Sequence, residues 1–193
     1  MPYSDRVAAA MDLMCTLHRD QQRKGSEVPY ITHPMAVAAL TGEYGGDEEQ
    51  FIAALLHDAV EDQGGQETLA LIRERFGDTV AGYVWACSDS DGHPKPPWRE
   101  RKEKHVGAAA AAPAQVKLIL AADKLHNAQC ILRDLRTQGK GLWGRFKGER
   151  EGTLWYYGAM LRALASDWEH PILLELHRAV DALHHAARET GSG

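Results

Sequence analysis

The residues of this chain best suited to chemistry are a His-Asp pair and a Glu-Asp pair that lie close together. His57 and Asp58 follow the apolar residues 54–56, and Glu61 and Asp62 come shortly afterwards. If this segment is one helix, positions four apart share a face, so His57 lies over Glu61. By the same spacing Asp58 lies over Asp62. Three carboxylates this close repel one another unless a positive charge lies among them. The spacing therefore predicts a divalent metal site with an acid or base group beside it.

Further ligands must come from other parts of the chain, because a metal held only by His57 and Asp58 would be weakly bound. We select His33, which lies beside Pro34 at a predicted helix start, and Asp123, a polar residue in an otherwise apolar segment. Two imidazoles and two carboxylates form a mixed nitrogen and oxygen site. Such a site suits Mn²⁺, Fe²⁺ or Zn²⁺ better than Ca²⁺.

The reaction predicted for this site is the attack of water on a phosphoryl group. A divalent metal can lower the pKa of bound water from ~15.7 toward ~7 and polarise a phosphoryl oxygen. Glu61 and Asp62 are placed to orient that water or to accept its proton. Arg23 and Lys24 precede the segment that carries His33, where they could receive phosphates or a base. A second basic group, expected to attract a polyanion, consists of Lys95, Arg99, Arg101, Lys102 and Lys104.

Several of these residues also have a purely structural interpretation. Asp123 could pair with Lys124 or Arg133 inside a helix, and His33 could be a capping or core histidine. The second basic group could be a solvated helix face. Another set of histidines is expected to be structural, because no carboxylate lies at a useful spacing from them. They are His126, His170, His177, His184 and His185.

The elements that position these residues are predicted to be helices. Apolar residues recur at a spacing of 3.6 in nearly every long segment, and strand-like alternation is almost absent. This pattern predicts an all-α fold. Asp47 and Gln50 form a capping box at the start of the helix that carries His57 and Asp58. The predicted helices cover about 4–21, 34–45, 47–63, 67–76, 78–87, 98–112, 114–135, 149–166 and 171–188.

Length and composition limit the class of protein. The chain has 193 residues with 44% hydrophobic content, which predicts a single domain over 1–193. A formal net charge of -5 argues against a general nucleic-acid binder. The three cysteines form no CxxC pair, so a reduced, cytoplasmic protein is expected. No apolar run approaches the ~20 residues that span a bilayer, so membrane insertion is not expected.

In their order along the chain, these motifs resemble the hydrolase domain of the RelA/SpoT alarmone enzymes, and most closely the free-standing small alarmone hydrolases. The resemblance runs from Leu17 to about Tyr157. The motifs that carry it are Gln22-Arg23-Lys24, Pro29-Tyr30-Ile31-Thr32-His33-Pro34, the segment 54–62, Phe76-Gly77, Ser88-Asp89 and Ala122-Asp123-Lys124-Leu125-His126-Asn127.

The resemblance implies an HD-superfamily domain of roughly eight to ten helices that hydrolyses the 3′-pyrophosphate of the alarmone (p)ppGpp. It implies one Mn²⁺ per chain, with another divalent metal as the alternative, held by His33, His57, Asp58 and Asp123. Glu61 and Asp62 would position the attacking water. The residues that the resemblance assigns to the nucleotide substrate are Arg23, Lys24, Ser88, Asp89, Lys95, Asn127 and Arg150. The loop 93–98 and His126 depart from the usual pattern of these enzymes.

Two other functions use the same residues. The first is a phosphatase of the same fold that acts on another nucleotide, such as the 2′-phosphate of NADPH, because the metal contacts a phosphoryl oxygen and not the base. The second is a non-catalytic helical module that binds a nucleotide or a partner. A non-catalytic module would be expected to have lost a ligand or the Glu-Asp pair. All six residues are present, which favours an enzyme.

Overall fold

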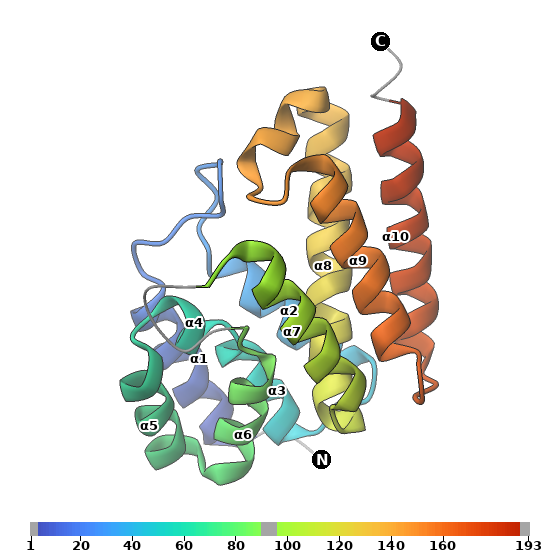
Figure 1. The fold of residues 1–193 in the computed structure, drawn as a ribbon. Coiled ribbons are helices and arrows are strands. Elements are labelled where there is room, and N and C mark those ends of the chain that lie inside the picture. Colours follow the sequence, from blue (N-terminus) through green and yellow to red (C-terminus); the bar gives the residue numbers. More distant parts are fainter. Residues whose placement is uncertain (1–3, 90–95, 190–193) are drawn as a thin grey trace. The chain divides into compact units, whose positions relative to one another are not determined.

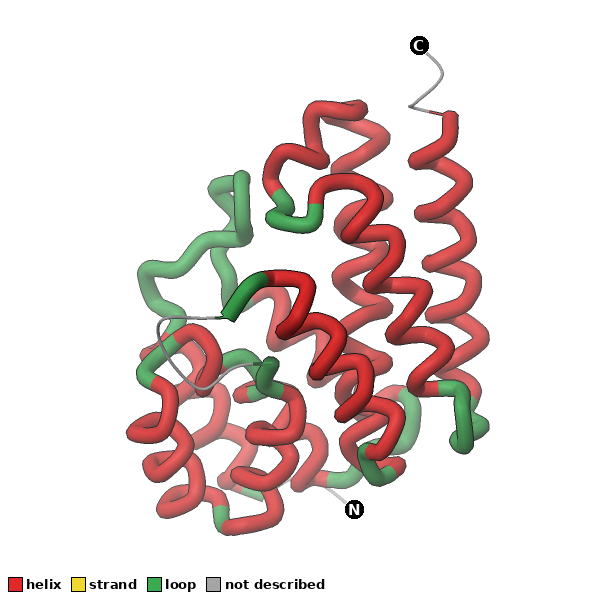
Figure 2. The backbone as a smooth tube through the Cα atoms, viewed as in Figure 1, coloured by secondary structure: helices red, strands yellow, loops and turns green. Residues whose placement is uncertain are grey.

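The computed structural model describes residues 4–89 and 96–189, and in these ranges the chain consists of helices joined by turns and loops (Figures 1 and 2). No strand occurs in the described ranges, in which Gln22 and Pro29 form an isolated antiparallel β-bridge. The predicted all-α class is confirmed. The helices are α1 (Asp5–Leu17), α2 (Thr32–Glu43), α3 (Glu48–Leu56), α4 (Ala59–Asp62), α5 (Gly65–Phe76), α6 (Asp78–Cys87), α7 (Trp98–Ala111), α8 (Ala114–Gln138), the 3₁₀ helix η1 (Gly139–Arg145), α9 (Glu149–Leu164) and α10 (Pro171–Glu189).

The helices belong to two compact units. Among the described residues, the first contains 4–89 and 112–120, and the second contains 96–111 and 121–189. Helix α8 begins in the first unit and continues into the second. The single domain expected from the length stays a prediction. No helix among the described residues is both long enough and apolar enough to cross a membrane.

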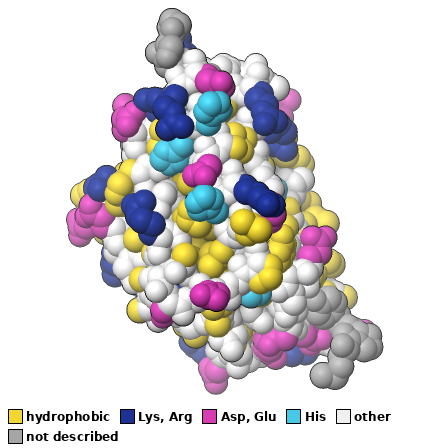
Figure 3. Space-filling view, turned by 90° about the vertical axis from the view of Figure 1, so that its right-hand side faces the viewer, with side chains coloured by type: hydrophobic (Ala, Val, Ile, Leu, Met, Phe, Trp, Pro, Cys, Tyr) yellow, Lys and Arg dark blue, Asp and Glu magenta, His cyan; other side chains and the backbone are white. Residues whose placement is uncertain are grey.

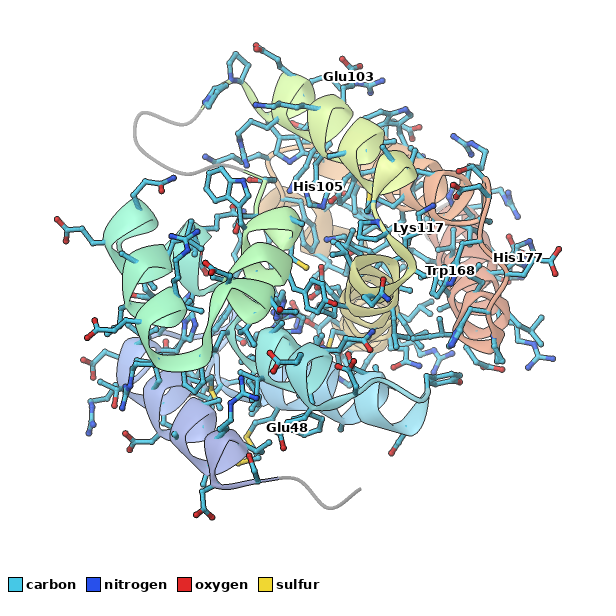
Figure 4. All side chains as sticks on the ribbon, turned by 90° about the horizontal axis from the view of Figure 1, so that it is seen from below. Glu48, Glu103, His105, Lys117, Trp168 and His177 are labelled. Carbon is cyan, nitrogen blue, oxygen red and sulfur yellow. The ribbon has the colours of Figure 1, made fainter. Side chains whose placement is uncertain are left out.

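Helix α3 is the centre of the first unit, since α1, α2 and α6 all pack against it. Its residues 52–56 are all buried. The predicted capping box is confirmed: Asp47 accepts a bond from the Gln50 amide at 2.9 Å, and the Gln50 side chain accepts one from Asp47 at 3.1 Å. Arg6 of α1 forms ion pairs with Glu48 (Figure 4) and Glu49 in the first turn of α3. The first turn of α3, the helix that leads to the candidate site, is therefore held by its own capping box and by the ion pairs with α1.

Two predicted helices are shorter than expected. The helix predicted over 4–21 ends at Leu17, and a loop follows in which Gln21 accepts a bond from the Tyr30 amide at 2.9 Å. The single helix predicted over 47–63 is wrong, because α3 ends at Leu56 and α4 starts at Ala59. The His57 ring bonds through Nδ1 to the Ala54 carbonyl at 2.8 Å. This carbonyl would accept from residue 58 in a continuous helix, so the side chain competes with the helical bond.

The second unit is built by α9, which packs against α7, α10 and η1. Trp98 lies directly on two glycines: a Cβ at Gly148 would be 2.5 Å from its ring, and one at Gly152 would be 3.0 Å from it. Only glycine allows this approach. The Trp98 ring also lies 6.3 Å from Trp155 and 6.5 Å from Tyr156, in edge-on geometry. The segment 139–148, which lies between two predicted helices, contains η1.

Candidate metal centre and active site

Three of the four predicted ligands, His33, His57 and Asp58, lie together in the first unit. Their ligand atoms are all within 4.8 Å of one another, and no other such group of three occurs among the described residues. Asp58 Oδ2 is 3.1 Å from Nε2 of His57 and 3.5 Å from Nε2 of His33. Both histidines are buried and Asp58 is partly exposed. The start of α2 and the turn between α3 and α4 supply these side chains.

The protonation of this group suits a cation. The bond between His57 Nδ1 and the Ala54 carbonyl requires a proton on Nδ1, so Nε2, the atom that faces Asp58, is the nitrogen through which His57 can bind a metal. Burial disfavours the charge on Asp58, but His57 and His33 outweigh burial and hold its pKa well below its usual range. Two imidazole nitrogens and a charged carboxylate at these distances fit a divalent metal.

Tyr30 holds the metal-site carboxylate from the loop before α2. Its hydroxyl donates a short hydrogen bond to Oδ2 of Asp58. Burial, with the nearby charges of Asp58 and Asp62, raises the pKa of Tyr30 well above its usual value, so the phenol keeps its proton and remains a donor. Tyr30 belongs to the motif 29–34, but nothing in the sequence indicated that its hydroxyl would bond Asp58.

The Glu-Asp pair lies on α4, which has only four residues. Asp62 Oδ2 accepts a bond from Nε2 of Gln21 at 2.8 Å. The other end of the Gln21 amide, Oε1, lies 2.8 Å from Nε2 of Gln63 and 2.6 Å from Nδ1 of His18. Sequence reasoning missed this network, because its members are far apart in the chain and glutamine carries no charge. Its one visible signal is the position of Gln21 beside the Arg23-Lys24 motif.

The predicted phosphate-binding pair lies in the loop between α1 and α2. The Arg23 amide donates to the Val28 carbonyl at 2.8 Å, which closes the loop, and the Arg23 guanidinium lies 5.6 Å from the centre of the Tyr30 ring. Arg23 therefore brings positive charge to the residue that bonds Asp58. Lys24 is exposed in the same loop.

Ser88 and Asp89 follow the end of α6, a helix that packs against α3 and α4. The Ser88 hydroxyl donates to the Val84 carbonyl at 3.1 Å. The substrate role of both residues stays a prediction. Lys95 lies outside the described residues.

Asp123, Asn127 and Arg150 belong to the second unit. Asp123 Oδ2 is 2.5 Å from the Lys124 ammonium, and its Oδ1 accepts from Asn127 at 2.5 Å. Burial opposes the charge on Lys124, but the attraction of Asp123 outweighs burial and raises the pKa of Lys124 well above its usual value. The alternative pairing with Lys124 therefore exists, and the ligand role of Asp123 stays a prediction.

Arg150 is tied into the second unit by its guanidinium. Nη1 is 2.5 Å from Glu151, and Nη2 donates to the Ala187 carbonyl at 3.1 Å. These contacts join α9 to the end of α10. The substrate role of Arg150 stays a prediction.

The members of the second basic group differ in exposure. Arg101 is buried, whereas Arg99 and Lys104 are exposed. The Arg99 guanidinium lies 3.4 Å from the centre of a Trp155 ring, and the Lys102 ammonium lies 4.8 Å from that of Tyr156. The attraction of a polyanion by this group stays a prediction.

The expectation that the α10 histidines have no carboxylate at a useful spacing is wrong. His177 lies 3.3 Å from Asp181, and His185 lies 3.2 Å from Glu189, each pair four residues apart on the helix. The spacing of four residues between each histidine and its carboxylate is visible in the sequence.

The chain matches the model of the HD domain over residues 10–154. It therefore belongs to the HD domain family. A Xenopus tropicalis protein named guanosine-3′,5′-bis(diphosphate) 3′-pyrophosphohydrolase is 37% identical over 133 residues, which cover 67% of this chain and 69% of that protein. The chain belongs, within the HD domain family, to the group that contains this relative.

Other similar proteins agree with this grouping. The Danio rerio protein of the same name is 41% identical over 121 residues, or 61% of this chain and 62% of that protein. A probable GTP pyrophosphokinase of Mycobacterium leprae is 39% identical over 123 residues, or 63% of this chain but only 15% of that protein. The chain thus matches less than two thirds of either of these relatives.

Two solved structures share the fold. A metazoan orthologue of SpoT, described as hydrolysing ppGpp, has a TM-score of 0.77 at 27% identity, over 94% of this chain and 97% of that one. A protein from Listeria monocytogenes has a TM-score of 0.68 at 32% identity, over 77% of this chain and 96% of that one.

Proposed function

We propose that this protein hydrolyses the 3′-pyrophosphate of the alarmone (p)ppGpp, releasing pyrophosphate and GDP or GTP. The observation that carries the proposal is the group of His33, His57 and Asp58 beside the Glu-Asp pair of α4. The relatives from Xenopus and Danio are named for this activity, and the metazoan SpoT orthologue of similar fold is described as hydrolysing ppGpp.

The proposed cofactor is one Mn²⁺ per chain, held by His33, His57 and Asp58 with Asp123 as the fourth ligand. When bound, it would activate a water molecule and polarise a phosphoryl oxygen. Nitrogen and oxygen donors in these proportions suit this class of metal. The proposal for Asp123 rests on the motif that contains it, because the structure describes Asp123 in the other unit.

The chain's own groups perform the remaining steps of the proposed reaction. Asp62, held by Gln21, accepts the proton of the attacking water, and Glu61 on the same short helix helps to orient that water. Arg23 and Lys24 neutralise the phosphates of the substrate from their loop. Tyr30 keeps Asp58 in one orientation by donating to it. Ser88, Asp89, Lys95, Asn127 and Arg150 complete the proposed nucleotide site.

A substrate panel tests the proposal. Purified protein with Mn²⁺ is given ppGpp, pppGpp, NADPH and simple nucleotides, and pyrophosphate and phosphate are measured separately. The proposal requires pyrophosphate release from ppGpp or pppGpp at a higher initial rate than any phosphate release. A preference for NADPH with phosphate as product would show a phosphatase of the same fold. No turnover beside an active homologue would show a non-catalytic module.

A further inference from the structure

An open groove between α9 and α10 is lined by residues that have no assigned part in the reaction. It has a volume of about 980 Å³, a size typical of small-molecule sites. Figure 3 shows the face of the molecule on which histidine side chains gather among lysines and arginines, beside a hydrophobic patch. The side chains that matter for a ligand are the apolar Leu161, Leu173 and Leu174 and the cationic or titratable Arg162, His184 and Arg188.

Two nitrogen groups converge on the floor of this groove. A Cβ at Gly158 would lie 3.4 Å from Nη1 of Arg162 and 3.8 Å from Nε2 of His184. Neither of these two side chains has a hydrogen bond or ion pair with any other described residue. Because Gly158 has no side chain, a space remains beside Arg162 Nη1 and His184 Nε2. A ligand in this space could also approach the backbone of Gly158 closely.

The charge balance of the groove favours an anion. The carboxylate in its lining, Asp181, lies 3.3 Å from His177. Arg162 has no carboxylate partner among the described residues and supplies a positive charge to the groove. Leu174 is 55% exposed in the same lining, so its side chain offers apolar surface to a ligand in the groove.

We propose that the groove between α9 and α10 binds a small organic anion that carries an apolar or aromatic group. The anionic head, a phosphate ester or a carboxylate, lies over Gly158 between Arg162 and His184. The apolar group lies along Leu161, Leu173 and Leu174.

The test uses phenyl phosphate and benzoate as probes, with inorganic phosphate and phenol as their separate halves. Each is titrated into the full-length, metal-free protein while the ring proton signals of the histidines are followed by NMR. The signal of His184 is identified by its loss in His184→Gln (Figure 4 labels the neighbouring His177 on α10). We expect a saturable shift of this signal, with phenyl phosphate or benzoate binding at least about tenfold more tightly than either half. The tighter of the two probes identifies the head group.

Gly158→Ala is the decisive variant. Its methyl group fills the space between the two donors at ordinary contact distances, and alanine is a better helix former than glycine. We expect binding to weaken about tenfold or more while the melting temperature stays the same or rises. Arg162→Gln should weaken binding too, whereas Arg178→Gln, on α10 but outside the groove lining, should not. Equal binding by Gly158→Ala and the wild type, or equal shifts with inorganic phosphate and phenyl phosphate, would overturn the proposal.

A second and independent observation concerns Gln21 of the first unit. Its side chain bonds Asp62 at one end and Gln63 and His18 at the other, and its carbonyl accepts from the Tyr30 amide. The Asp62 carboxylate only accepts, so it fixes which end of the Gln21 amide donates. The end with two hydrogens is then the one that faces Asp62.

We infer that Gln21 is a positioning residue that acts through Asp62, a role that rests on the proposed function. Gln21 holds the Asp62 carboxylate and links it to the loop that carries Arg23 and Lys24. Two backbone hydrogen bonds close this loop, one from the Tyr30 amide to the Gln21 carbonyl and one from the Arg23 amide to the Val28 carbonyl. Substrate binding by this loop and proton acceptance by Asp62 therefore share one hydrogen-bonded support.

The test compares two neighbouring glutamines. Gln22 is exposed, and no described residue contacts its side chain through a hydrogen bond, so Gln22→Leu is the matched control for Gln21→Leu. With ppGpp as substrate, we expect Gln21→Leu to lower kcat about 10- to 100-fold with little change in KM or metal content. Gln22→Leu should leave all three unchanged. A change in KM alone, or an equal effect of the two variants, would overturn the inference.

A double-mutant cycle separates positioning from general damage to the fold. In an Asp62→Ala background, Gln21→Leu should have almost no further effect on kcat, because the group through which it acts is gone. The same cycle is run on melting temperatures of metal-free protein, where the two losses should be less than additive. If the wild type releases no pyrophosphate, the proposed function fails. The melting cycle still decides whether Gln21 and Asp62 are coupled, and additive losses would refute that coupling.

Discussion

The surroundings of Asp58 in the first unit and of Trp98 in the second are built by different forces. In the first region, single directed hydrogen bonds hold particular carboxylate oxygens: Tyr30 donates to Asp58, and Gln21 donates to the nearby Asp62. Around Trp98, rings lie on glycines and on other rings. A hydrogen bond adds only about 1 kcal/mol of net stability, but it sets an orientation that packing does not. The first region is therefore expected to lose activity when changed, and the second to lose stability.

Asp58→Ala should give the largest effect. It removes the carboxylate that both site histidines face, so metal content should fall and ppGpp hydrolysis should drop by more than about 10³-fold. The melting temperature of the metal-free protein should change little. Metal analysis, turnover and thermal unfolding check this, with the exposed Asp12→Ala as control. Unchanged turnover would rule out Asp58 as a ligand.

Trp98→Ala should give the opposite pattern. Loss of the ring that fills the space above Gly148 and Gly152 should lower the free energy of unfolding by about 3 kcal/mol. The kcat per folded molecule should remain close to that of the wild type. Trp85→Ala, at a tryptophan that is 42% exposed, should cost much less. Denaturant unfolding measures both, and equal losses would mean that the glycine contacts add nothing.

Asp123→Asn sharpens the comparison, because Asp123 has both a structural partner and a proposed ligand role. As a ligand it should weaken metal binding by about 10²-fold, measured by titration of the metal-free protein. Lys124→Met tests the partner separately and should mainly lower the melting temperature, since it leaves Asp123 without its cation. If Asp123→Asn lowers only the melting temperature, the structural pairing is its whole role.

Tyr30→Phe should give the smallest change. It removes one donor to Asp58 and keeps the ring that lies beside His18 and His33. Metal affinity should fall about 10-fold, because residues that orient a ligand contribute this much. The melting temperature should be almost unaffected. A loss as large as that of Asp58→Ala would show that Tyr30 does more than hold the carboxylate.

The sequence predicted the parts of the molecule that depend on local spacing. Helical periodicity gave the all-α class, and the pattern of Asp47 and Gln50 gave a cap that forms as expected. His33, His57 and Asp58 could be selected because metal ligands need particular residue types. The break at residues 57–58 was missed, because a side-chain bond to a backbone carbonyl leaves no periodic signal.

Residues that act through distant contacts could not be found in this way. Gln21 and Asp62 are 41 positions apart, and a neutral amide shows no preference for a carboxylate in sequence. Trp98 and Gly148 are farther apart still, and neither residue type indicates the other as its partner. The alternatives for Asp123 stayed open for a different reason, since the same carboxylate suits a lysine and a metal.

Helix α4 is too short to be stable alone, because isolated helices below ~12 residues are marginal in water. Its order is therefore supported from outside, in part through the bonds that Gln21 makes to Asp62 and Gln63. The amide protons of 61–63 should then exchange with deuterated solvent at a rate set by opening of the loop between α1 and α2. Deuterium uptake at these few amides would report, without any substrate or label, how often the proposed catalytic carboxylates lose their orientation.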